Sequence, residues 1–259
     1  MMPILWIVGI LMLGWIAYMV YCAHDDHIQC DQITCSRLPN EFNSFHILLI
    51  ADIHRRKLNP KTFEKWSQVP DIVCIAGDLM ERGVPYGKMR SNIRVLKQWK
   101  TPVFFVWGNN DYETQPNEMI RILKQEGVII LEDEIHTLHR NQAQIKVVGF
   151  DFYFDYFDDS SQIDWSVIKD SFTILLTHNP KTYDMLENKE KAKIDLVLAG
   201  HTHGGQIRIF GIGPYTKGGL SYCNHTNMVI TEGYGYSLLP FRFGTKAECH
   251  FLTLQTSKS

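Results

Sequence analysis

The first 23 residues form a continuous apolar stretch that contains no charged side chain. Between residues 4 and 20 nearly every position is aliphatic, aromatic or glycine, and no polar face interrupts the pattern. A helix needs about 20 such residues to cross the ~30 Å hydrocarbon layer of a bilayer. The pattern therefore predicts a single transmembrane anchor at residues 1–23. A cleavable signal peptide is the alternative, but neither a basic start nor a clear cleavage site is present.

The remaining chain alternates short β-branched runs with helical patterns, which is typical of an α/β layered domain. We interpret the polar stretch at residues 24–44 as a tether and residues 45–259 as one domain. Alternating strand patterns at 129–150 and 228–254 predict a second sheet, so the expected fold is a two-sheet β-sandwich flanked by helices. Crossover helices are predicted at residues 62–66, 88–100 and 116–126.

Composition fits a globular domain of ordinary character. The 259 residues are 45% hydrophobic and 21% charged, which excludes a disordered chain and a multi-span membrane protein. A formal net charge of −2 gives no basic field, so nucleic acid is not an expected partner. Any anionic substrate must therefore be met by local charges.

The six cysteines show neither a CxxC pair nor the spacing of a zinc ribbon. Cys74 and Cys249 are predicted to be core residues. Cys30 and Cys35 either close a small disulfide, if their segment faces an oxidising compartment, or remain free thiols.

Five predicted strands each end in side chains that can carry chemistry. Ligands in α/β sheets collect at the carboxyl ends of strands, so these side chains are expected to converge on one site. The strands are 47–51 before Asp52, 72–76 before Gly77-Asp78, 103–107 before Gly108-Asn109, 174–177 before His178, and 196–199 before Gly200-His201.

The types of these side chains indicate a metal site. In Asp52-Ile53-His54, alternate residues point the same way and can hold one ion together. The carboxylate of Asp78 has two oxygens with which to bridge two cations. In the run 200–205, Gly-His-Thr-His-Gly-Gly, two imidazoles alternate between glycines that permit tight turns. Imidazoles combined with carboxylates and one amide suit Mn, Fe, Zn or Co better than Mg or Ca, and we favour Mn.

This order of motifs resembles the calcineurin-like metallophosphoesterase family, whose pattern is D-x-H, G-D, G-N-H-D/E, H and G-H-x-H. The form GHTHGGQIRI and the later runs at 213–215 and 239–244 most resemble membrane-associated bacterial phosphoesterases of the UDP-diacylglucosamine hydrolase type. The resemblance implies an αββα fold and two divalent metal ions. It implies one ion held by Asp52, His54, Asp78 and His203, and another held by Asp78, Asn109, His178 and His201.

By the same resemblance the protein is a membrane-anchored phosphohydrolase that cleaves a phosphodiester or pyrophosphate bond by metal-activated hydroxide. Its substrate would be a phosphorylated small molecule or a lipid- or nucleotide-linked phosphate, and Asp78, His178 and Asn110 would be its catalytic residues. The alternative is a catalytically weak, metal-dependent sensor or binding protein for a phosphorylated ligand at the membrane.

Asn110 departs from the family pattern, because it stands where G-N-H-D has histidine. An amide can donate a hydrogen bond to a phosphoryl oxygen, but it cannot deliver a proton at neutral pH. General acid help typically contributes ~10²–10⁴-fold, so its loss slows substrates with poor leaving groups most. The sequence therefore favours a pyrophosphate or activated diester over an alkyl monoester. Alternatively, His136 or His225 supplies the proton.

Two further segments leave alternatives open. The run Arg55-Arg56-Lys57 either meets phosphate groups or forms a solvated turn. The apolar segment 236–243 either packs in the core or contacts the membrane or an acyl chain.

The flanks of the apolar stretch bear on its orientation. No Lys or Arg precedes it, and the first one after it is Arg37. The charge pattern favours a single-pass protein of the cell membrane with its catalytic domain on the outer face.

Overall fold

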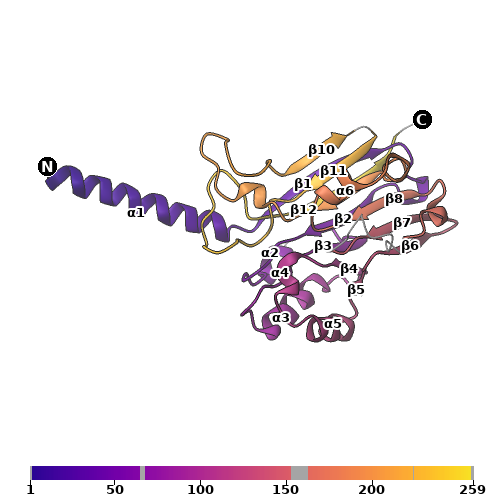
Figure 1. The fold of residues 1–259 in the computed structure, drawn as a ribbon, viewed down its shortest axis with the longest axis horizontal. Coiled ribbons are helices and arrows are strands. Elements are labelled where there is room, and N and C mark those ends of the chain that lie inside the picture. Colours follow the sequence, from indigo (N-terminus) through magenta and orange to yellow (C-terminus); the bar gives the residue numbers. More distant parts are fainter. Residues whose placement is uncertain (1, 65–67, 153–162, 224, 258–259) are drawn as a thin grey trace.

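The computed structural model describes residues 2–64, 68–152, 163–223 and 225–257. A long N-terminal helix, α1 (Met2–His24), projects from a body made of two packed β-sheets (Figure 1). Helices cover the outer faces of the body, which confirms the predicted two-sheet α/β sandwich. The acidic and aromatic residues at 151–159, whose composition predicts a surface loop, lie largely outside the described residues.

The first sheet has the strand order β1-β12-β2-β3-β4-β5, in which β2 to β5 are parallel and β12 is antiparallel to β2. Every residue of β3 and β4 is buried, as expected for central parallel strands that are covered on both faces. The strands are β1 (His27–Cys35), β2 (Phe45–Ile50), β3 (Ile72–Ala76), β4 (Val103–Val106), β5 (Ile129–Ile130) and β12 (Glu248–Thr256).

The second sheet has the order β10-β11-β9-β8-β7-β6. The prediction that 129–150 and 228–254 together form this sheet is wrong in part, because β5 and β12 belong to the first sheet. β12 is buried along most of its length and therefore fits between β1 and β2. The strands are β6 (Glu134–Arg140), β7 (Ala143–Gly149), β8 (Phe172–Leu176), β9 (Leu196–Ala199), β10 (Gly219–Cys223) and β11 (Thr226–Ile230).

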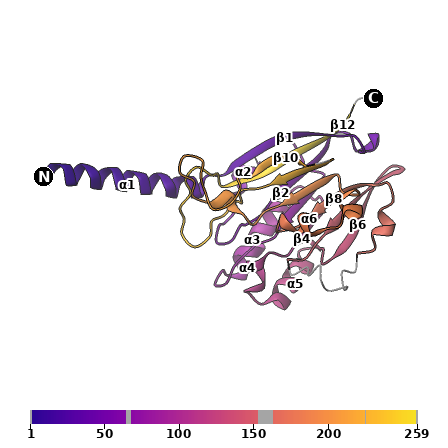
Figure 2. The ribbon, with the colours of Figure 1, turned by 45° about the horizontal axis from the view of Figure 1, so that its top comes forward.

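Two apolar layers follow from the alternation of side chains along each strand. On β2, Ile47 and Leu49 face the space between the sheets, whereas Leu48 and Ile50 face the helices. Figures 1 and 2 show these helices gathered on the outer face of the first sheet. They are α2 (Pro60–Glu64), α3 (Tyr86–Leu96), α4 (Asn109–Tyr112) and α5 (Pro116–Gln125), while the short α6 (Lys181–Met185) and α7 (Asn188–Lys191) follow strands of the second sheet.

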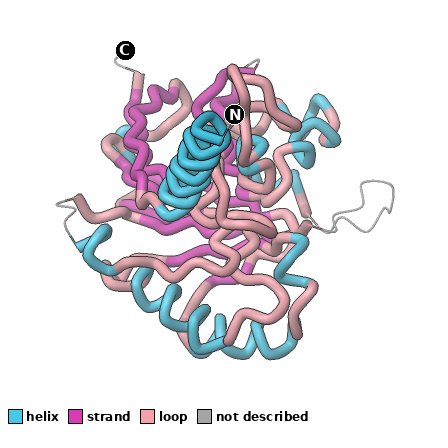
Figure 3. The backbone as a smooth tube through the Cα atoms, turned by 90° about the vertical axis from the view of Figure 1, so that its left-hand side faces the viewer, coloured by secondary structure: helices cyan, strands magenta, loops and turns pink. Residues whose placement is uncertain are grey.

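Helix α1 is the one helix in the described part of the chain that is long and apolar enough to cross a membrane. Its 23 residues extend over roughly 34 Å. Only Met19 and Ala23, near its C-terminal end, are buried against the body. Figure 3 views the molecule from this side, with α1 standing in front of the sheets.

The structure differs from the tether predicted at residues 24–44. Residues 27–35 form β1, which pairs in parallel with β12 at the edge of the first sheet. The polar side chains that suggested a tether are those of an edge strand, which has one side facing water. The chain thus passes from α1 into the sheet with only two residues, Asp25 and Asp26, between them.

Arg56 fixes this junction. Its guanidinium donates to the carbonyls of Asp25 (2.9 Å) and His24 (3.1 Å) and to the carboxylate of Asp26 (2.5 Å). It also lies 4.4 Å over the ring of Tyr234. Arg56 is buried, so for this residue neither alternative drawn from the sequence holds. These contacts tie the C-terminal end of α1 to the body.

The cysteine predictions can be compared directly with the fold. Cys74 and Cys249 are fully buried, as predicted. Cys30 and Cys35 lie five positions apart on β1, which separates them by roughly 16 Å. That distance is far beyond the reach of a disulfide, so the structure favours free thiols.

Candidate metal centre

The five strand ends meet at one edge of the sandwich. The turns after β2 and β3 are joined by hydrogen bonds from the Asp52 amide to the Gly77 carbonyl (3.0 Å) and from the His54 amide to the Asp78 carbonyl (3.1 Å). The turn after β9, in the second sheet, joins them through the His201 amide, which donates to Asp52 Oδ2 (3.0 Å). Residues from both sheets therefore line a single site.

A first group of candidate ligands surrounds His54. Its Nε2 lies 3.1 Å from His203 Nε2, 3.9 Å from Asp52 Oδ1 and 3.7 Å from Asp78 Oδ2. His203 Nε2 lies 3.4 Å from Asp52 Oδ1. Donor atoms ~2.1 Å from one ion lie roughly 3.0–3.4 Å apart at tetrahedral or right angles. The four side chains therefore face a common point with spacings near those of a metal cage.

A second group shares Asp78 with the first. His178 Nε2 lies 3.4 Å from Asp78 Oδ2 and 3.0 Å from His201 Nδ1. Asn109 lines the same cavity beside Asp78 and His201. The seven residues that the sequence nominated thus fall into two adjoining groups with Asp78 between them.

The backbone at the site is unusual. Asp52 (φ 54°), His54 (φ 50°), Asp78 (φ 50°), His201 (φ 73°) and His203 (φ 50°) all adopt the left-handed region. Such conformations cost of order 1–3 kcal/mol each and persist where the surrounding structure imposes them. The strand ends turn sharply here, and this turn aims five candidate ligands inward.

Two glycines permit the close approach of the turns. A Cβ on Gly108 would lie 2.2 Å from Asp78 Oδ1, and one on Gly200 would lie 2.7 Å from Asp52 Oδ2. Any side chain at either position would therefore displace a candidate ligand. This explains why the Gly-Asn and Gly-His pairs need glycine.

The unsatisfied atoms of the site fit divalent cations. In the described part of the chain, the buried Oδ1 atoms of Asp52 and Asn109 have no hydrogen-bond partner. Burying a polar atom without a partner is costly. Two pairs of imidazole nitrogens also face each other at 3.0–3.1 Å. Two nitrogen lone pairs that point at each other repel unless a cation or a proton lies between them. Two ions placed in the two groups would satisfy these atoms, and the nitrogen and oxygen donors suit Mn, Fe, Zn or Co.

The charges of the site are strongly coupled. Burial raises the pKa of Asp78, but the imidazoles of His178 and His54 outweigh it and hold that pKa well below its usual range. Burial lowers the pKa of His178, yet Asp78 and Asp52 raise it to about 9. Burial and the neighbouring His178 lower the pKa of His201 to about 4. The carboxylates thus favour the charged form of the His178 imidazole, whereas burial favours the neutral form of His201.

Asn110 lies against Asp78 rather than free in the cavity. Its backbone amide donates to Asp78 Oδ1 (2.8 Å) and its side-chain amide donates to Asp78 Oδ2 (2.7 Å). The two histidines considered as substitute acids lie elsewhere. His136 packs on the ring of Phe104 (5.0 Å), and His225 Nε2 contacts the Lys191 carbonyl (3.0 Å). Neither lines the cavity.

The sequence did not reveal two residues that position the candidate ligands. Glu81 Oε2 lies 3.0 Å from His54 Nδ1, and Arg55 pairs with the other oxygen of Glu81. The buried guanidinium of Arg242 contacts the carbonyl (3.4 Å) and Nδ1 (3.2 Å) of His203. Glu81 follows Asp78 by three residues, which is the one local signal that could have pointed to it.

Glu81→Gln is expected to weaken metal binding about 10–100-fold, because the carboxylate that orients His54 and makes its ring more basic is lost. Isothermal titration of Mn²⁺ into the metal-free protein measures the change. Glu113→Gln, on a side chain outside the candidate metal centre, is the matched control and should leave the affinity unchanged. Equal affinities for wild type and Glu81→Gln would show that Glu81 does not support the site.

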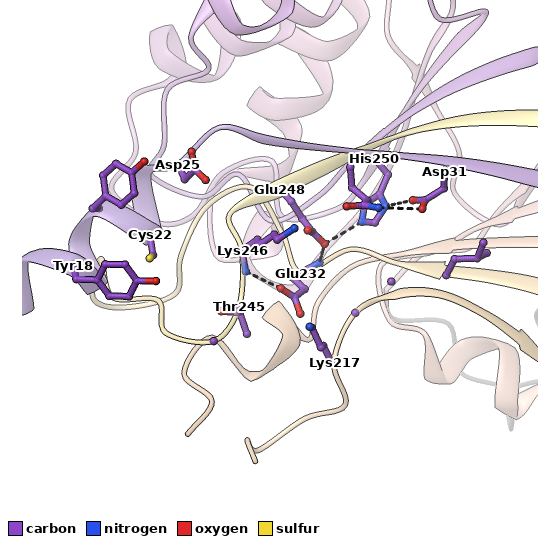
Figure 4. A pocket seen from close by; sticks show the side chains of 16 residues that line it. Tyr18, Cys22, Asp25, Asp31, Lys217, Glu232, Thr245, Lys246, Glu248 and His250 are labelled. Carbon is purple, nitrogen blue, oxygen red and sulfur yellow. Dashed lines mark hydrogen bonds and ion pairs between the residues drawn. The ribbon is translucent and has the colours of Figure 1, made fainter. Parts of the chain in front are cut away.

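The candidate metal centre opens into a cavity of about 350 Å³ that is lined by Asn110, Gln206, Tyr215 and Leu238 as well as by candidate ligands. A separate cavity of about 500 Å³ lies where α1 meets the body (Figure 4). There, His250 bridges Asp31 (3.1 Å) and Glu248 (3.0 Å). None of the seven candidate ligands lines this second cavity.

The fold and the donor set define a class, the metal-dependent phosphoesterases, and comparison with known proteins agrees. Residues 45–205 match the family described as calcineurin-like phosphoesterase. The chain is 35% identical over 243 residues to the uncharacterized protein YpbG of Bacillus subtilis (strain 168), covering 92% of this chain and 91% of that protein. The protein belongs to the calcineurin-like metallophosphoesterase family, whose members depend on two metal ions.

Two further comparisons are informative. A Danio rerio protein named transmembrane protein with metallophosphoesterase domain is 28% identical over 248 residues, covering 86% of this chain and 56% of that protein. The structure of Haemophilus influenzae NAD nucleotidase has a TM-score of 0.51 at 17% identity, covering 74% of this chain and 45% of that chain. The second comparison supports the sandwich fold alone.

Proposed function

We propose that the protein is a membrane-anchored dimetal phosphohydrolase that cleaves a pyrophosphate or activated phosphodiester bond in a nucleotide- or lipid-linked substrate. The observation that carries the proposal is the pair of ligand groups that share Asp78, with facing imidazole nitrogens 3.0–3.1 Å apart. One ion would be held by Asp52, His54, Asp78 and His203, and the other by Asp78, Asn109, His178 and His201. We favour Mn for both.

When bound, two divalent ions would acidify a water nucleophile and neutralise the phosphoryl oxygens. The residues of the chain prepare that geometry. The Ala76 carbonyl contacts His178 Nδ1 (2.8 Å), which turns Nε2 toward Asp78. Asn110 holds both oxygens of Asp78 in place. No covalent intermediate with the protein is required.

Asn110 also supports the choice of substrate. It lines the cavity and can offer its second N–H to a phosphoryl oxygen, but it has no proton to give to a leaving group at neutral pH. A nucleotide phosphate is a good leaving group and needs little such help. The same feature favours the second candidate function, a phosphate-ligand sensor of low catalytic activity.

We also propose that α1 anchors the catalytic domain to the outer face of the cell membrane. Residues 1–23 carry no charged side chain, and the first Lys or Arg after the helix is Arg37. No positive charge next to the helix therefore favours a cytoplasmic position for the domain. The hydrogen bonds of Arg56 to the end of α1 would hold the domain in a fixed orientation relative to the bilayer.

Turnover measurements test the proposed function. The full chain in detergent micelles, with Mn²⁺, is expected to hydrolyse bis(p-nitrophenyl) phosphate and a UDP-linked lipid, to lose both activities on chelation and to regain them with Mn²⁺. An absence of turnover in protein that holds two metal ions per chain would overturn the enzyme proposal and leave the sensor.

A further inference from the structure

Two loops lie beside the C-terminal end of α1 (Figure 1). Large apolar side chains on both loops are exposed. We call these loops the hairpin loop (residues 207–215) and the proline loop (residues 236–243). The most exposed side chains are those of Phe210 (98%), Leu238 (88%) and Ile212 (78%). Others that are exposed on the two loops are Ile207, Ile209, Tyr215 and Leu239.

The hairpin loop is held in a defined conformation by hydrogen bonds. Ile209 and Ile212 exchange two backbone hydrogen bonds of 2.9 Å, so Phe210 and Gly211 form a two-residue turn. The guanidinium of Arg208 braces the turn by donating to the Gly211 carbonyl (2.6 Å) and the Tyr215 carbonyl (2.5 Å). An exposed apolar tip is therefore held in one position.

The tips of both loops have positive φ angles, which favour Gly, Asn or Asp, yet they carry large apolar residues. Phe210 has φ 51° and Gly211 has φ 81°, and turns of this kind favour Asn-Gly or Asp-Gly. Leu238, at the tip of the proline loop, has φ 61°. A bulky side chain at positive φ is strained, and here burial in the core does not explain it. The backbone cost points to a function for the exposed side chains.

Both loops lie at the depth of the last turns of α1. Phe243 of the proline loop packs edge-on against Trp15 (5.7 Å) and Tyr18 (6.3 Å) of the helix. The Phe243 carbonyl accepts from the Arg208 amide (2.7 Å), which ties the hairpin loop to the same place. Trp15 precedes the end of α1 by nine residues, or roughly 14 Å. If α1 crosses a bilayer, both loops reach its surface.

The same two loops contribute to the wall of the cavity at the candidate metal centre. Tyr215 and Leu238 line that cavity together with Gln206. The side chain of Gln206 joins the loops, because its amide donates to the carbonyls of Ser237 (3.1 Å) and Leu239 (3.3 Å). Residues of both loops therefore line the cavity that leads to the candidate metal centre.

We propose that the two loops dock on a lipid bilayer with Phe210, Ile212 and Leu238 among the acyl chains, and that the substrate is an amphiphile taken directly from that bilayer. This inference rests on the proposed phosphohydrolase function and on α1 as the anchor. The phosphate enters the cavity between the tips while the acyl part stays in the membrane. Continuity with α1 identifies the bilayer, rather than a second protein, as the occupant of the apolar tips.

A double substitution tests the role of the loops in substrate capture. Phe210→Asn with Ile212→Thr removes the apolar tip, and Asn suits positive φ, so the turn should still form. With the full chain in vesicles of phosphatidylcholine and phosphatidylglycerol, turnover of a UDP-linked lipid should fall roughly tenfold or more. Turnover of soluble bis(p-nitrophenyl) phosphate should change less than about twofold. Val69→Thr with Val167→Thr, two exposed apolar positions away from α1, is the matched control.

An equal fall in both activities, or no fall in either, would overturn the inference. A wild-type protein without turnover of either substrate would instead contradict the proposed function. A measurement of how deeply the loop enters the bilayer tests the docking inference separately from the proposed function, because it does not require enzymatic activity. A fluorophore on Phe210→Cys, with Cys22, Cys30 and Cys223 replaced by Ser, should be quenched by doxyl lipids, whereas one on Val167→Cys should not. Unquenched Phe210→Cys, or a change of oligomeric state in the double variant, would exclude the bilayer as occupant.

Discussion

Asp78→Asn is expected to abolish hydrolysis almost completely, with kcat lowered roughly a thousandfold or more. Asp78 Oδ2 lies within 3.7 Å of His54 Nε2 and 3.4 Å of His178 Nε2, so its carboxylate joins the two ligand groups. An amide of the same shape has one carbonyl oxygen and no charge, and cannot bridge two cations. Steady-state kinetics with bis(p-nitrophenyl) phosphate measures the loss, and elemental analysis should find fewer than two metal ions per chain.

The substitution should leave the backbone fold intact, because Asn is isosteric with Asp. Far-UV circular dichroism checks this. Asp184→Asn, on an exposed side chain that does not line the cavity, is the matched control and should retain full activity and metal content. If Asp78→Asn kept near-wild-type kcat with two metals bound, Asp78 would not be the bridging ligand.

Asn110→His is expected to raise turnover of an alkyl phosphate ester by about a hundredfold, while bis(p-nitrophenyl) phosphate gains little. An imidazole beside Asp78 can protonate a leaving oxygen, which Asn110 cannot do. A poor leaving group depends on that proton, whereas p-nitrophenolate does not. The ratio of the two kcat/KM values before and after the substitution is therefore the quantity to measure.

Asn110→Gln provides the comparison, since it keeps an amide and adds no titrating group. It should not raise turnover of the alkyl ester. Equal gains on both substrates in Asn110→His would mean that the histidine acts by something other than proton donation. No gain on either substrate would also count against the missing-acid argument.

The convergence of the nominated side chains could be predicted from the sequence because its determinants are local. The strands before Asp52, Asp78 and Asn109 are short apolar runs that end in glycine or a polar residue, and parallel buried strands read this way. Parallel strands also place their carboxyl ends at one edge, so convergence followed from the pattern alone. The positive φ angles of five candidate ligands could not be predicted from the sequence pattern, because they arise where the turns of both sheets meet.

The features that the sequence missed depend on distant contacts. β1 reads as a polar tether because it is an edge strand, and its partner, β12, lies more than 200 residues later. Arg242 sits in an apolar run that suggested a membrane contact, yet its guanidinium is buried against His203. Glu81 looks like an ordinary surface residue until the fold brings it to His54. No local periodicity encodes such pairings.

The central claim is that seven residues from two sheets hold two metal ions around Asp78. Anomalous diffraction from crystals of the Mn²⁺-loaded protein, recorded at the manganese edge, tests it most directly. We predict two peaks roughly 3.5–4 Å apart, one beside His54 and His203 and the other beside His178 and His201. A single peak, or peaks away from these side chains, would contradict the account.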